Sequence, residues 1–370
     1  MGNLGRLLPA AALVLAACSS SQPIQIGIAG AFTDAIGRPM VLGAQMAVDE
    51  INAAGGVNGH PLELIELNDF GEPDSAIVVA NRLYASDAVA VIGHLYSGTT
   101  LAAAPVYNSG ADPVVAISPS SSSPEVSRAG PYTFRVCPSD LAHGAALARW
   151  VRERLGLARG TVLYLNDQYG RGVRERFVAE FTRRGGEVLA VAPYLGDKPD
   201  VAPYLARMQQ DGRSQFIVVA GNRSEAEEVL RQMDARGMDV PLLGADGLEG
   251  IEESGALAEG VYETLAYLSL IDTPANQKFV RAYRARYPAE LPPNQPAAAS
   301  YDAIHLLRQV MERVGTGRSD IRDALAAVGE DAPFEGVTGR IAFDSLGDVP
   351  TREVHVAVVR NGALRIAGGQ

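Results

Sequence analysis

Apolar residues along the first third of this chain form short runs, separated by longer stretches in which apolar positions recur with a helical period. Short runs bounded by turn residues are typical of buried strands, whereas the 3.6-residue period is typical of helices packed on a core. The pattern predicts strands at 24–29, 62–68, 89–92 and 114–117, and helices at 41–53, 73–86 and 99–109. This alternation is typical of a parallel, doubly wound α/β sheet.

The alternation restarts after residue 136. It predicts helices at 142–155, 173–184, 201–210 and 224–236, a turn at 166–172, and strands at 161–165, 188–192, 216–220 and 241–244. Later residues predict helices at 274–286, 296–313 and 321–328 and strands at 339–343 and 353–360. These later helices and strands follow two complete α/β lobes. Their presence indicates that the chain crosses between the lobes more than once. A ligand would then lie in the crevice outside the strand carboxyl ends.

Two hydroxyl-rich turns follow neighbouring strands of the first lobe, at 97–100 and 118–123. We expect each turn to lead into a helix, beginning at Leu101 and at Pro124, because proline suits the first helical position. Free backbone N–H groups and the helix dipole would make each turn an anion site for a small carboxylate or phosphate. Alternatively, the hydroxyls act only as helix caps and residues 120–123 form a flexible loop. The tandem arrangement favours the ligand site.

The N-terminal residues indicate that the protein is exported from the cytoplasm. Residues 1–17 carry one charge, at Arg6, and then an apolar run from Leu7 to Ala17. This run of about 11 residues is shorter than the ~20 needed to span a bilayer, and it fits a secretory signal peptide. The following Leu-Ala-Ala-Cys resembles a bacterial lipobox, in which Cys18 becomes the acylated first residue. An ordinary signal peptide with an incidental cysteine is the alternative. Residues 18–23 would form a short tether.

Composition narrows the possible partners. The chain has 370 residues, 47% of them hydrophobic, and a net charge of −11. This length allows about two domains, and the acidic balance argues against nucleic acid, which needs clustered lysine and arginine. No other apolar run approaches membrane length. The only cysteine besides Cys18 is Cys137, so we expect no disulfide.

The sequence shows no catalytic motif. Its five histidines lack metal-ligand spacing, and phosphate-loop, nucleophile-elbow and dinucleotide fingerprints are absent. Only Ser97, three residues after His94, suggests a nucleophile and base, and this spacing across a strand–loop junction defines no geometry. We therefore expect neither an enzyme nor a bound cofactor or metal.

Five stretches together resemble the branched-chain amino-acid (Leu/Ile/Val) binding proteins of ABC importers: residues 47–59, 91–95, 117–119, 167–170 and 243–247. The resemblance extends from residue 24 to about residue 360. It implies the type I periplasmic binding protein fold, with two doubly wound parallel-sheet lobes and a ligand cleft at the hinge. The expected lobes are 24–138 plus 266–345 and 139–265 plus 346–370.

The resemblance also implies site residues. Ser97 and Ser122 match the family's hydroxyls for the ligand α-carboxylate, and Ser120 would supply backbone contacts. Tyr169 matches an aromatic that packs on the ligand. Asp246 takes the place of the family's glutamate, which pairs with the α-ammonium. Aspartate shortens that reach by one CH₂, so the amine would lie deeper or a water would bridge it.

Asn222 stands where the family commonly has an aromatic side chain on the wall of the second lobe, and Arg223 follows it. A polar ligand would explain this departure. Alternatively, both residues belong to a solvated loop in which Ser224 caps the next helix.

The first loop is shorter than usual and places Asp34 or Ile36 where a tyrosine often occurs. Phe70 and Tyr96 replace a cysteine pair found in some members, and Tyr96 would narrow the pocket beside Ser97.

We therefore predict an extracytoplasmic, membrane-anchored lipoprotein that captures a small amino acid or related carboxylate for an ABC permease in the inner membrane. The alternative is a sensor or regulatory module of the same fold. A neighbouring permease gene would favour transport, and a neighbouring kinase or enzyme gene would favour sensing.

Overall fold

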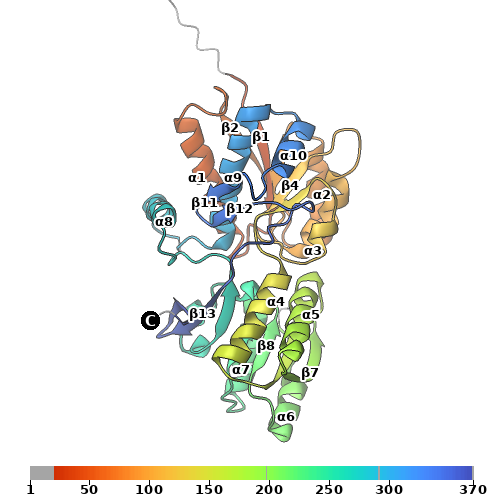
Figure 1. Ribbon diagram of the computed structural model, residues 1–370, viewed down its shortest axis with the longest axis vertical. Coiled ribbons are helices and arrows are strands. Elements are labelled where there is room, and N and C mark those ends of the chain that lie inside the picture. Colours follow the sequence, from red (N-terminus) through yellow and green to blue (C-terminus); the bar gives the residue numbers. More distant parts are fainter. Residues whose placement is uncertain (1–20, 197, 291, 369–370) are drawn as a thin grey trace, which may run out of the picture.

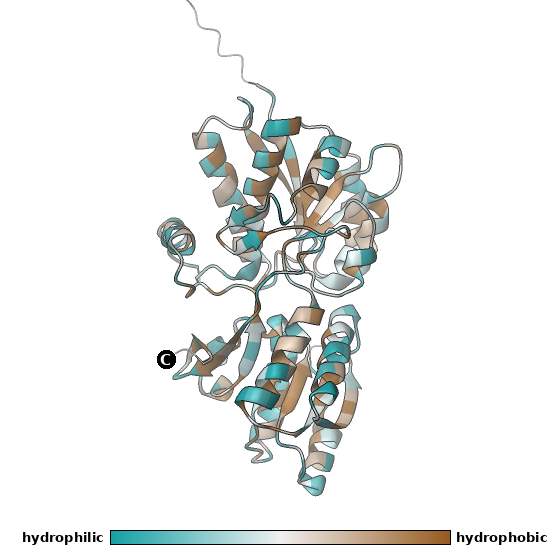
Figure 2. Ribbon diagram, in the orientation of Figure 1, coloured by the Kyte–Doolittle hydropathy of each residue, from teal (hydrophilic) through white to brown (hydrophobic). Residues whose placement is uncertain are grey.

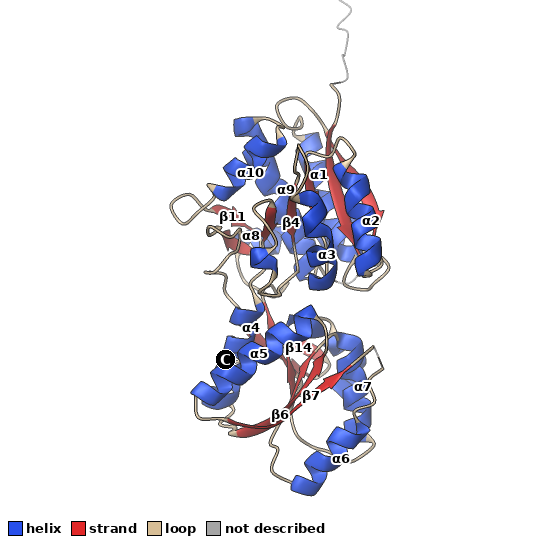
Figure 3. Ribbon diagram, turned by 90° about the vertical axis from the view of Figure 1, so that its right-hand side faces the viewer, coloured by secondary structure: helices blue, strands red, loops and turns tan. Residues whose placement is uncertain are grey.

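The computed structural model describes residues 21–196, 198–290 and 292–368. It contains two separate α/β units stacked along the long axis of the molecule, each with a central sheet flanked by helices (Figures 1 and 3). The strands and inward helix faces are apolar and the outer helix faces are hydrophilic, as expected for sheets buried on both faces (Figure 2).

The first sheet is parallel, with strand order β2-β1-β3-β4-β5. Its strands are β1 (Ile24–Gly30), β2 (Leu62–Asn68), β3 (Ala90–Ile92), β4 (Val115–Ser118) and β5 (Thr133–Arg135). The connecting helices are α1 (Arg38–Ala53), α2 (Pro73–Tyr84) and α3 (Ser97–Tyr107). Late helices α8 (Pro274–Arg286), α9 (Gln295–Val314) and α10 (Arg318–Ala326) join this lobe, and α9 packs along α1.

The second sheet has strand order β14-β13-β10-β9-β8-β6-β7. Its strands are β6 (Arg159–Leu165), β7 (Glu187–Tyr194), β8 (Ile217–Ala220), β9 (Leu242–Gly244), β10 (Tyr262–Leu265), β13 (His355–Arg360) and β14 (Ala363–Ile366). Strands β13 and β14 are antiparallel additions at one edge. The helices are α4 (Asp140–Arg149), α5 (Gln168–Arg183), α6 (Ala202–Asp211) and α7 (Arg223–Asp234).

Shorter elements complete the fold. A π-helical turn, Trp150–Arg154, extends α4, and 3₁₀ segments lie at Val126–Arg128, Asp246–Leu248 and Ile251–Ala258. Strands β11 (Phe334–Gly336) and β12 (Gly339–Ile341) form a hairpin of their own. Strands β5, β10, β11 and β14 were not predicted, because each has only three or four residues, too few to show a clear period.

Two predicted helix starts were wrong. Helix α3 begins at Ser97, so the residues expected to form a loop are its first turn. Helix α5 begins at Gln168 within the expected turn, because the side chain of Asp167 caps it by accepting the N–H of Gly170 at 2.7 Å.

The third error concerns Pro124. It is followed only by the three-residue 3₁₀ segment Val126–Arg128, so the second serine turn does not end at an α-helix.

The chain passes between the two units near residues 137–139, 266–273 and 344–354. The lobe boundaries at 138, 265 and 345 stay a prediction. The signal peptide 1–17 and Cys18 lie outside the described residues. Among the helices that are described, none combines the length and apolar character that a membrane span requires.

Candidate functional site

A cavity of about 620 Å³ lies where the carboxyl ends of the two parallel sheets face each other. Residues from both lobes line it, which is the position expected for a ligand in an α/β fold. All seven predicted ligand-binding residues are among its lining: Tyr96, Ser97, Ser120, Ser122, Tyr169, Asn222 and Asp246. Whether they contact a ligand stays a prediction.

The first wall of the cavity is the N-terminus of α3. Ser97, Gly98 and Thr99 form its first turn and line the cavity. The first backbone N–H groups of a helix have no partner within the helix, and no side chain caps α3 at Tyr96. The dipole of this 11-residue helix adds positive potential at the same place. The first predicted anion site is therefore the first helical turn rather than a loop before it, and anion binding there stays a prediction.

The serine loop at 118–123 supports that wall from the side. The hydroxyl of Ser118 donates to the carbonyl of His94 at 2.8 Å and accepts the N–H of Ser121 at 2.9 Å. The hydroxyl of Ser97 accepts the N–H of Ser123 at 3.1 Å. These hydroxyls bind the protein's own backbone, so the loop is buried rather than flexible. With no α-helix after it, the predicted second anion site is not formed.

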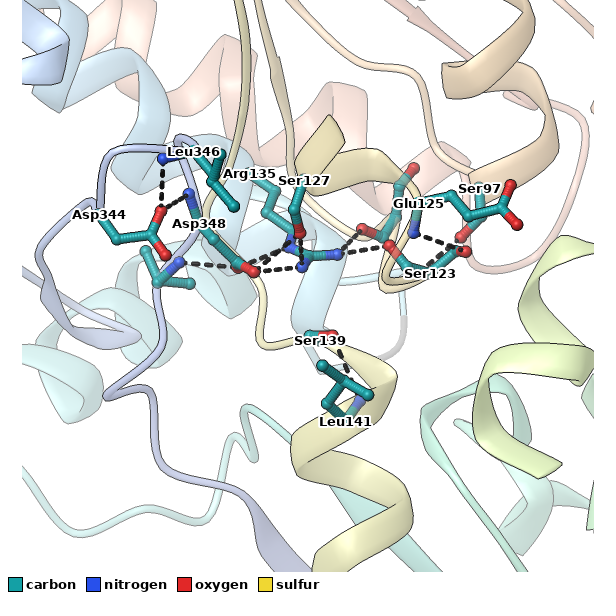
Figure 4. A network of polar contacts seen from close by, with 12 residues as sticks. Ser97, Ser123, Glu125, Ser127, Arg135, Ser139, Leu141, Asp344, Leu346 and Asp348 are labelled. Carbon is teal, nitrogen blue, oxygen red and sulfur yellow. Dashed lines mark hydrogen bonds and ion pairs between the residues drawn. The ribbon is translucent and has the colours of Figure 1, made fainter. Parts of the chain in front are cut away.

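A buried arginine holds the serine loop in place (Figure 4). Arg135, 1% exposed, donates to the carbonyl of Ser123 at 2.8 Å and to the hydroxyl of Ser127 at 2.6 Å. Its Nε also donates to Oδ1 of Asp348 at 2.7 Å. Strand β5, the serine loop and the last crossing segment are therefore fixed to one another.

The second lobe contributes Tyr169 and Asp246. The Tyr169 hydroxyl donates to Oδ1 of Asp246 at 2.9 Å and accepts the N–H of Gly247 at 2.7 Å. Gly247 approaches so closely that a side chain there would lie 2.5 Å from the carbonyl oxygen of Gly221. Burial and the charge of Asp246 raise the pKa of Tyr169 well above its usual value, so the phenol stays protonated as a donor.

Three buried titratable groups lie behind Asp246. His143, at 0% exposure, places Nε2 3.5 Å from Oδ2 of Asp246, and its Nδ1 lies 3.1 Å from the Thr264 hydroxyl. Burial lowers the pKa of His143 despite that carboxylate. Burial also raises the pKa values of Asp140 and Glu263, whose charged forms have little access to water. Sequence reasoning missed this layer, which joins three segments of the chain.

Tyr96 narrows the cavity beside Ser97. Its hydroxyl donates to Oδ2 of Asp34 at 2.7 Å, so Asp34 and Tyr96 form one polar wall of the first lobe. Ile36 and Phe70 also line the cavity, and Phe70 is 59% exposed.

Asn222 combines the two predicted alternatives. It lines the cavity and is also the N-cap of α7, where Glu225 accepts its backbone N–H at 2.7 Å. The prediction that Ser224 is the cap was therefore wrong. Arg223 points to Glu227 and Glu253, at 2.8 and 2.9 Å, and does not line the cavity.

Glu249 and Gln295 line the cavity and were missed from the sequence. Glu249 of the second lobe accepts the N–H of Gln295, the first residue of α9, at 2.8 Å. The Gln295 amide donates to the carbonyl of Pro119 at 2.7 Å. Glu249 comes three residues after Asp246 at the end of a strand, which is a signal that could have identified it. Gln295 gave no local signal.

The His94 and Ser97 pair is not a catalytic dyad. The imidazole of His94 is buried, with Nδ1 2.5 Å from Oδ2 of Asp69 and Nε2 3.1 Å from the hydroxyl of Tyr107. Both ring nitrogens are therefore used inside the first lobe. Over the described part of the chain, no three His, Cys, Asp or Glu residues are grouped to hold a metal ion.

The model of a family described as periplasmic binding protein matches residues 23–363. The leucine-, isoleucine-, valine-, threonine-, and alanine-binding protein of Pseudomonas aeruginosa is 30% identical over 359 residues, which cover 94% of this chain and 93% of that protein. These relatives are binding proteins, which agrees with the expectation that the chain is not an enzyme.

Solved structures show the same fold. The branched-chain amino acid transporter substrate binding protein of Streptococcus pneumoniae, in complex with isoleucine, has a TM-score of 0.81 at 28% identity and covers 92% of this chain and 97% of its own. A leucine binding protein of Thermotoga maritima has a TM-score of 0.84 at 28% identity. The match covers 93% of this chain and 98% of that protein. The predicted two-lobed α/β fold class is confirmed.

Proposed function

Because this chain belongs to the periplasmic binding protein family, we propose that it captures an amino acid or a related carboxylate and presents it to the permease of an ABC importer. Its relatives support the class of ligand, since they are named as binding proteins for leucine, isoleucine, valine, threonine or alanine. The single observation that carries the proposal is the cavity, which has an uncapped helix N-terminus on one wall and a carboxylate on the other.

The ligand carboxylate would lie at the first turn of α3. Free N–H groups of this turn and the hydroxyl of Ser97 face the same cavity as Ser120 and Ser122. The ligand ammonium would pair with Asp246, whose orientation is fixed by Tyr169. A buried ammonium requires such a partner, because an unpaired charge is costly to bury. The two charged ends of one amino acid would therefore bind different lobes.

A ligand held from both sides favours a closed arrangement of the lobes. A ligand shifts a conformational equilibrium only by its difference in affinity for the two states. Contacts to α3 in one lobe and to Asp246 in the other can form together only when the cleft is closed. We propose that closure about the crossing segments is the signal that the permease recognises.

Thermal melting of the purified protein against a panel of amino acids, amides, dicarboxylates and aromatic acids tests this function. A ligand that binds only the folded protein raises its melting temperature, by an amount that grows with concentration. We expect an α-amino acid to raise it, and Asp246→Ala to abolish the shift. If only amine-free acids raise it, Asp246 loses its assigned role. If no member of the panel raises it, the proposed class of ligand is wrong.

We further propose that Cys18 carries a lipid anchor, on the basis of its lipobox-like context. Cys18→Ala should release the protein from the membrane fraction without changing its ligand-induced melting shift. A wild-type protein recovered only in the soluble fraction would contradict the anchor. The sensor alternative differs only in the partner, so capture of the closed form by a permease rather than a signalling protein separates the two.

A further inference from the structure

The cavity lining is strongly acidic. Six carboxylates line it against one guanidinium, and no lysine or histidine. The carboxylates are Asp34, Glu72, Asp167, Glu225, Asp246 and Glu249, and the guanidinium is Arg171. An amino acid with an aliphatic side chain brings one ammonium, which is enough for one carboxylate. Glu249 is mostly protonated at neutral pH, because burial raises its pKa to about 8, but the other carboxylates are still more than the family's usual ligand explains.

Arg171 is the only cation of the described lining, and its charge acts on Asp167. Within the described residues, none of the six forms an ion pair with lysine or arginine, and Asp246 has only the buried His143 nearby. Arg171 is exposed and donates to the side-chain and backbone oxygens of Asn166, at 3.1 Å each. The guanidinium of Arg171 therefore forms its hydrogen bonds within its own loop.

Two of the acids, Asp34 and Glu225, line the cavity from opposite lobes. Asp34 of the first lobe accepts the Tyr96 hydroxyl, and the negative charge of Glu225, in the second lobe, acts on the same phenol. Burial, then both carboxylates, raise the pKa of Tyr96. Glu225 is 3% exposed and also lines the cavity. Asp34 and Glu225 therefore define an acidic end of the cavity, beside Asn222.

Helix capping does not account for this end. Glu225 closes a capping box at α7, but its buried carboxylate has only neutral donors there. Asp34 caps no described helix, and the only side-chain donor it receives is the Tyr96 hydroxyl. Burial raises the pKa of Glu225, because its charged form has little access to water.

We propose that the ligand is an α-amino acid whose side chain ends in a positively charged nitrogen group, an ammonium or a guanidinium, which binds between Asp34 and Glu225. This inference rests on the proposed function, because the α-carboxylate and α-ammonium must occupy α3 and Asp246 for the side chain to reach that end. Asn222 makes this wall polar, where an aromatic wall would favour an aliphatic side chain. A charge-assisted hydrogen bond is roughly twice as strong as a neutral one, so the charged group also gives specificity.

Calorimetric titration with matched pairs of ligands tests the proposal. Lysine and norleucine differ in the terminal ammonium, and arginine and citrulline differ in the guanidinium charge. We expect the charged member of at least one pair to bind about tenfold tighter or more, in line with the strength of charge-assisted hydrogen bonds. This preference should weaken with added salt, although less than for exposed charges.

Variants then locate the charge. Asp34→Asn keeps an oxygen for the Tyr96 hydroxyl, and Glu225→Gln keeps an oxygen for the α7 cap. Each should lower the ratio of charged to neutral affinity. Asp74→Asn is the matched control, because Asp74 is an exposed carboxylate of α2 that does not line the cavity. The ratio should be the same in this control as in the wild type.

The outcomes separate the two levels of the proposal. If leucine or norleucine binds as tightly as lysine and arginine, the inference is overturned and the amino-acid function stands. If the charged ligands win but neither cavity variant changes the ratio, Asp34 and Glu225 are not the site of the charge. If no amino acid binds, the proposed function fails as well.

Discussion

The hydroxyl of Tyr169 bridges Asp246 and the backbone of Gly247, donating to the carboxylate at 2.9 Å and accepting the N–H at 2.7 Å. Tyr169 lies in the first turn of α5, and Asp246 begins a 3₁₀ segment 77 residues later. One hydroxyl therefore sets the direction of the carboxylate that we assign to the ligand ammonium. The following predictions test this site and the elements that support it.

Tyr169→Phe should weaken ligand binding while leaving the cavity shape nearly intact. A hydrogen bond to a charged group contributes about 1.5–3 kcal/mol, so the affinity should fall by roughly tenfold or more. The Gly247 N–H also loses its acceptor, which should lower the free energy of unfolding by about 1–3 kcal/mol. Titration calorimetry measures the first effect and denaturant unfolding the second. An unchanged affinity would show that the orientation of Asp246 does not matter.

Gly98→Ala should separate stability from binding. Gly98 lies in the first turn of α3, and an added Cβ would meet no other atom within 4 Å, because it points into open space. Alanine has a higher helix propensity than glycine, so the unfolding free energy should rise by up to about 1 kcal/mol. The new methyl would occupy the space of the ligand carboxylate. We therefore expect a melting temperature that is unchanged or higher and an affinity reduced at least tenfold.

The control for this variant is Gly212→Asn, in the αL C-cap of α6, far from the cavity lining. Asparagine tolerates the left-handed conformation, so this change should leave ligand affinity as it is. A Gly98→Ala protein that binds as tightly as the wild type would remove the first turn of α3 from the site.

Arg135→Met should both destabilise the protein and weaken binding. Arg135 is 1% exposed and joins Asp348 to the serine loop (Figure 4). Breaking a buried ion pair from one side costs about 3–5 kcal/mol, because the remaining charge is left without its partner. The loop that carries Ser120 and Ser122 would lose its donor at Ser123. Chemical denaturation and ligand titration check the two effects.

Arg213→Met is the matched surface control. Arg213 pairs with Glu187, and both side chains are about half exposed, at 49% and 55%. Exposed pairs contribute little, so the melting temperature should barely move. A similar loss in both variants would mean that burial of Arg135 is not the reason for its effect.

Ligand affinity should rise with pH towards about 8. Burial raises the pKa of Glu249 to about 8, so this carboxyl is mostly protonated in the free protein at neutral pH. A cationic amine bound near Asp246 favours the charged form of Glu249, and binding should therefore release a proton. As pH rises from 6 to 8, Glu249 loses this proton before the ligand binds. The affinity should therefore increase and then level off. Titrations in buffers of different ionisation enthalpy measure the proton release directly.

Glu249→Gln should make the affinity independent of pH over that range, since glutamine keeps an acceptor for the Gln295 N–H but has no proton to lose. An affinity of the wild type that stays constant from pH 6 to 8 would contradict the link between Glu249 and the ligand.

Local patterns in the chain determined much of the fold. The strand at 62–68 and the helix at 274–286 have the bounds predicted for them. Both have clear periodicity and a turn or cap at each end, and the N-cap Thr273 accepts the N–H of Asn276. The start of helix α3 was placed two to four residues late, because its first turn is made of Ser, Gly and Thr, which are typical of loops.

Some residues of the candidate site could likewise be found from the sequence, and others could not. Ser97 follows a strand end and could be found from the sequence, because the carboxyl ends of parallel strands share one edge. Glu249 could have been found by the same rule. Asp246 was identified from the resemblance to the binding-protein family. The partners of Tyr96 and Asn222, in contrast, were identified only when the side chains were placed.

The sequence by itself determined the alternation of strands and helices, the two-lobed α/β class and some of the positions that line the cleft. Only the tertiary structure decided which distant segments meet there. Gln295 reaches Pro119 across 176 residues of sequence, and Arg135 reaches Asp348 across 213. Local periodicity carries no information on such contacts, because they depend on how the chain crosses between the lobes. The acidic residues of the cavity, which point to a cationic ligand, also come from both lobes. They lie together only because the chain crosses between the lobes.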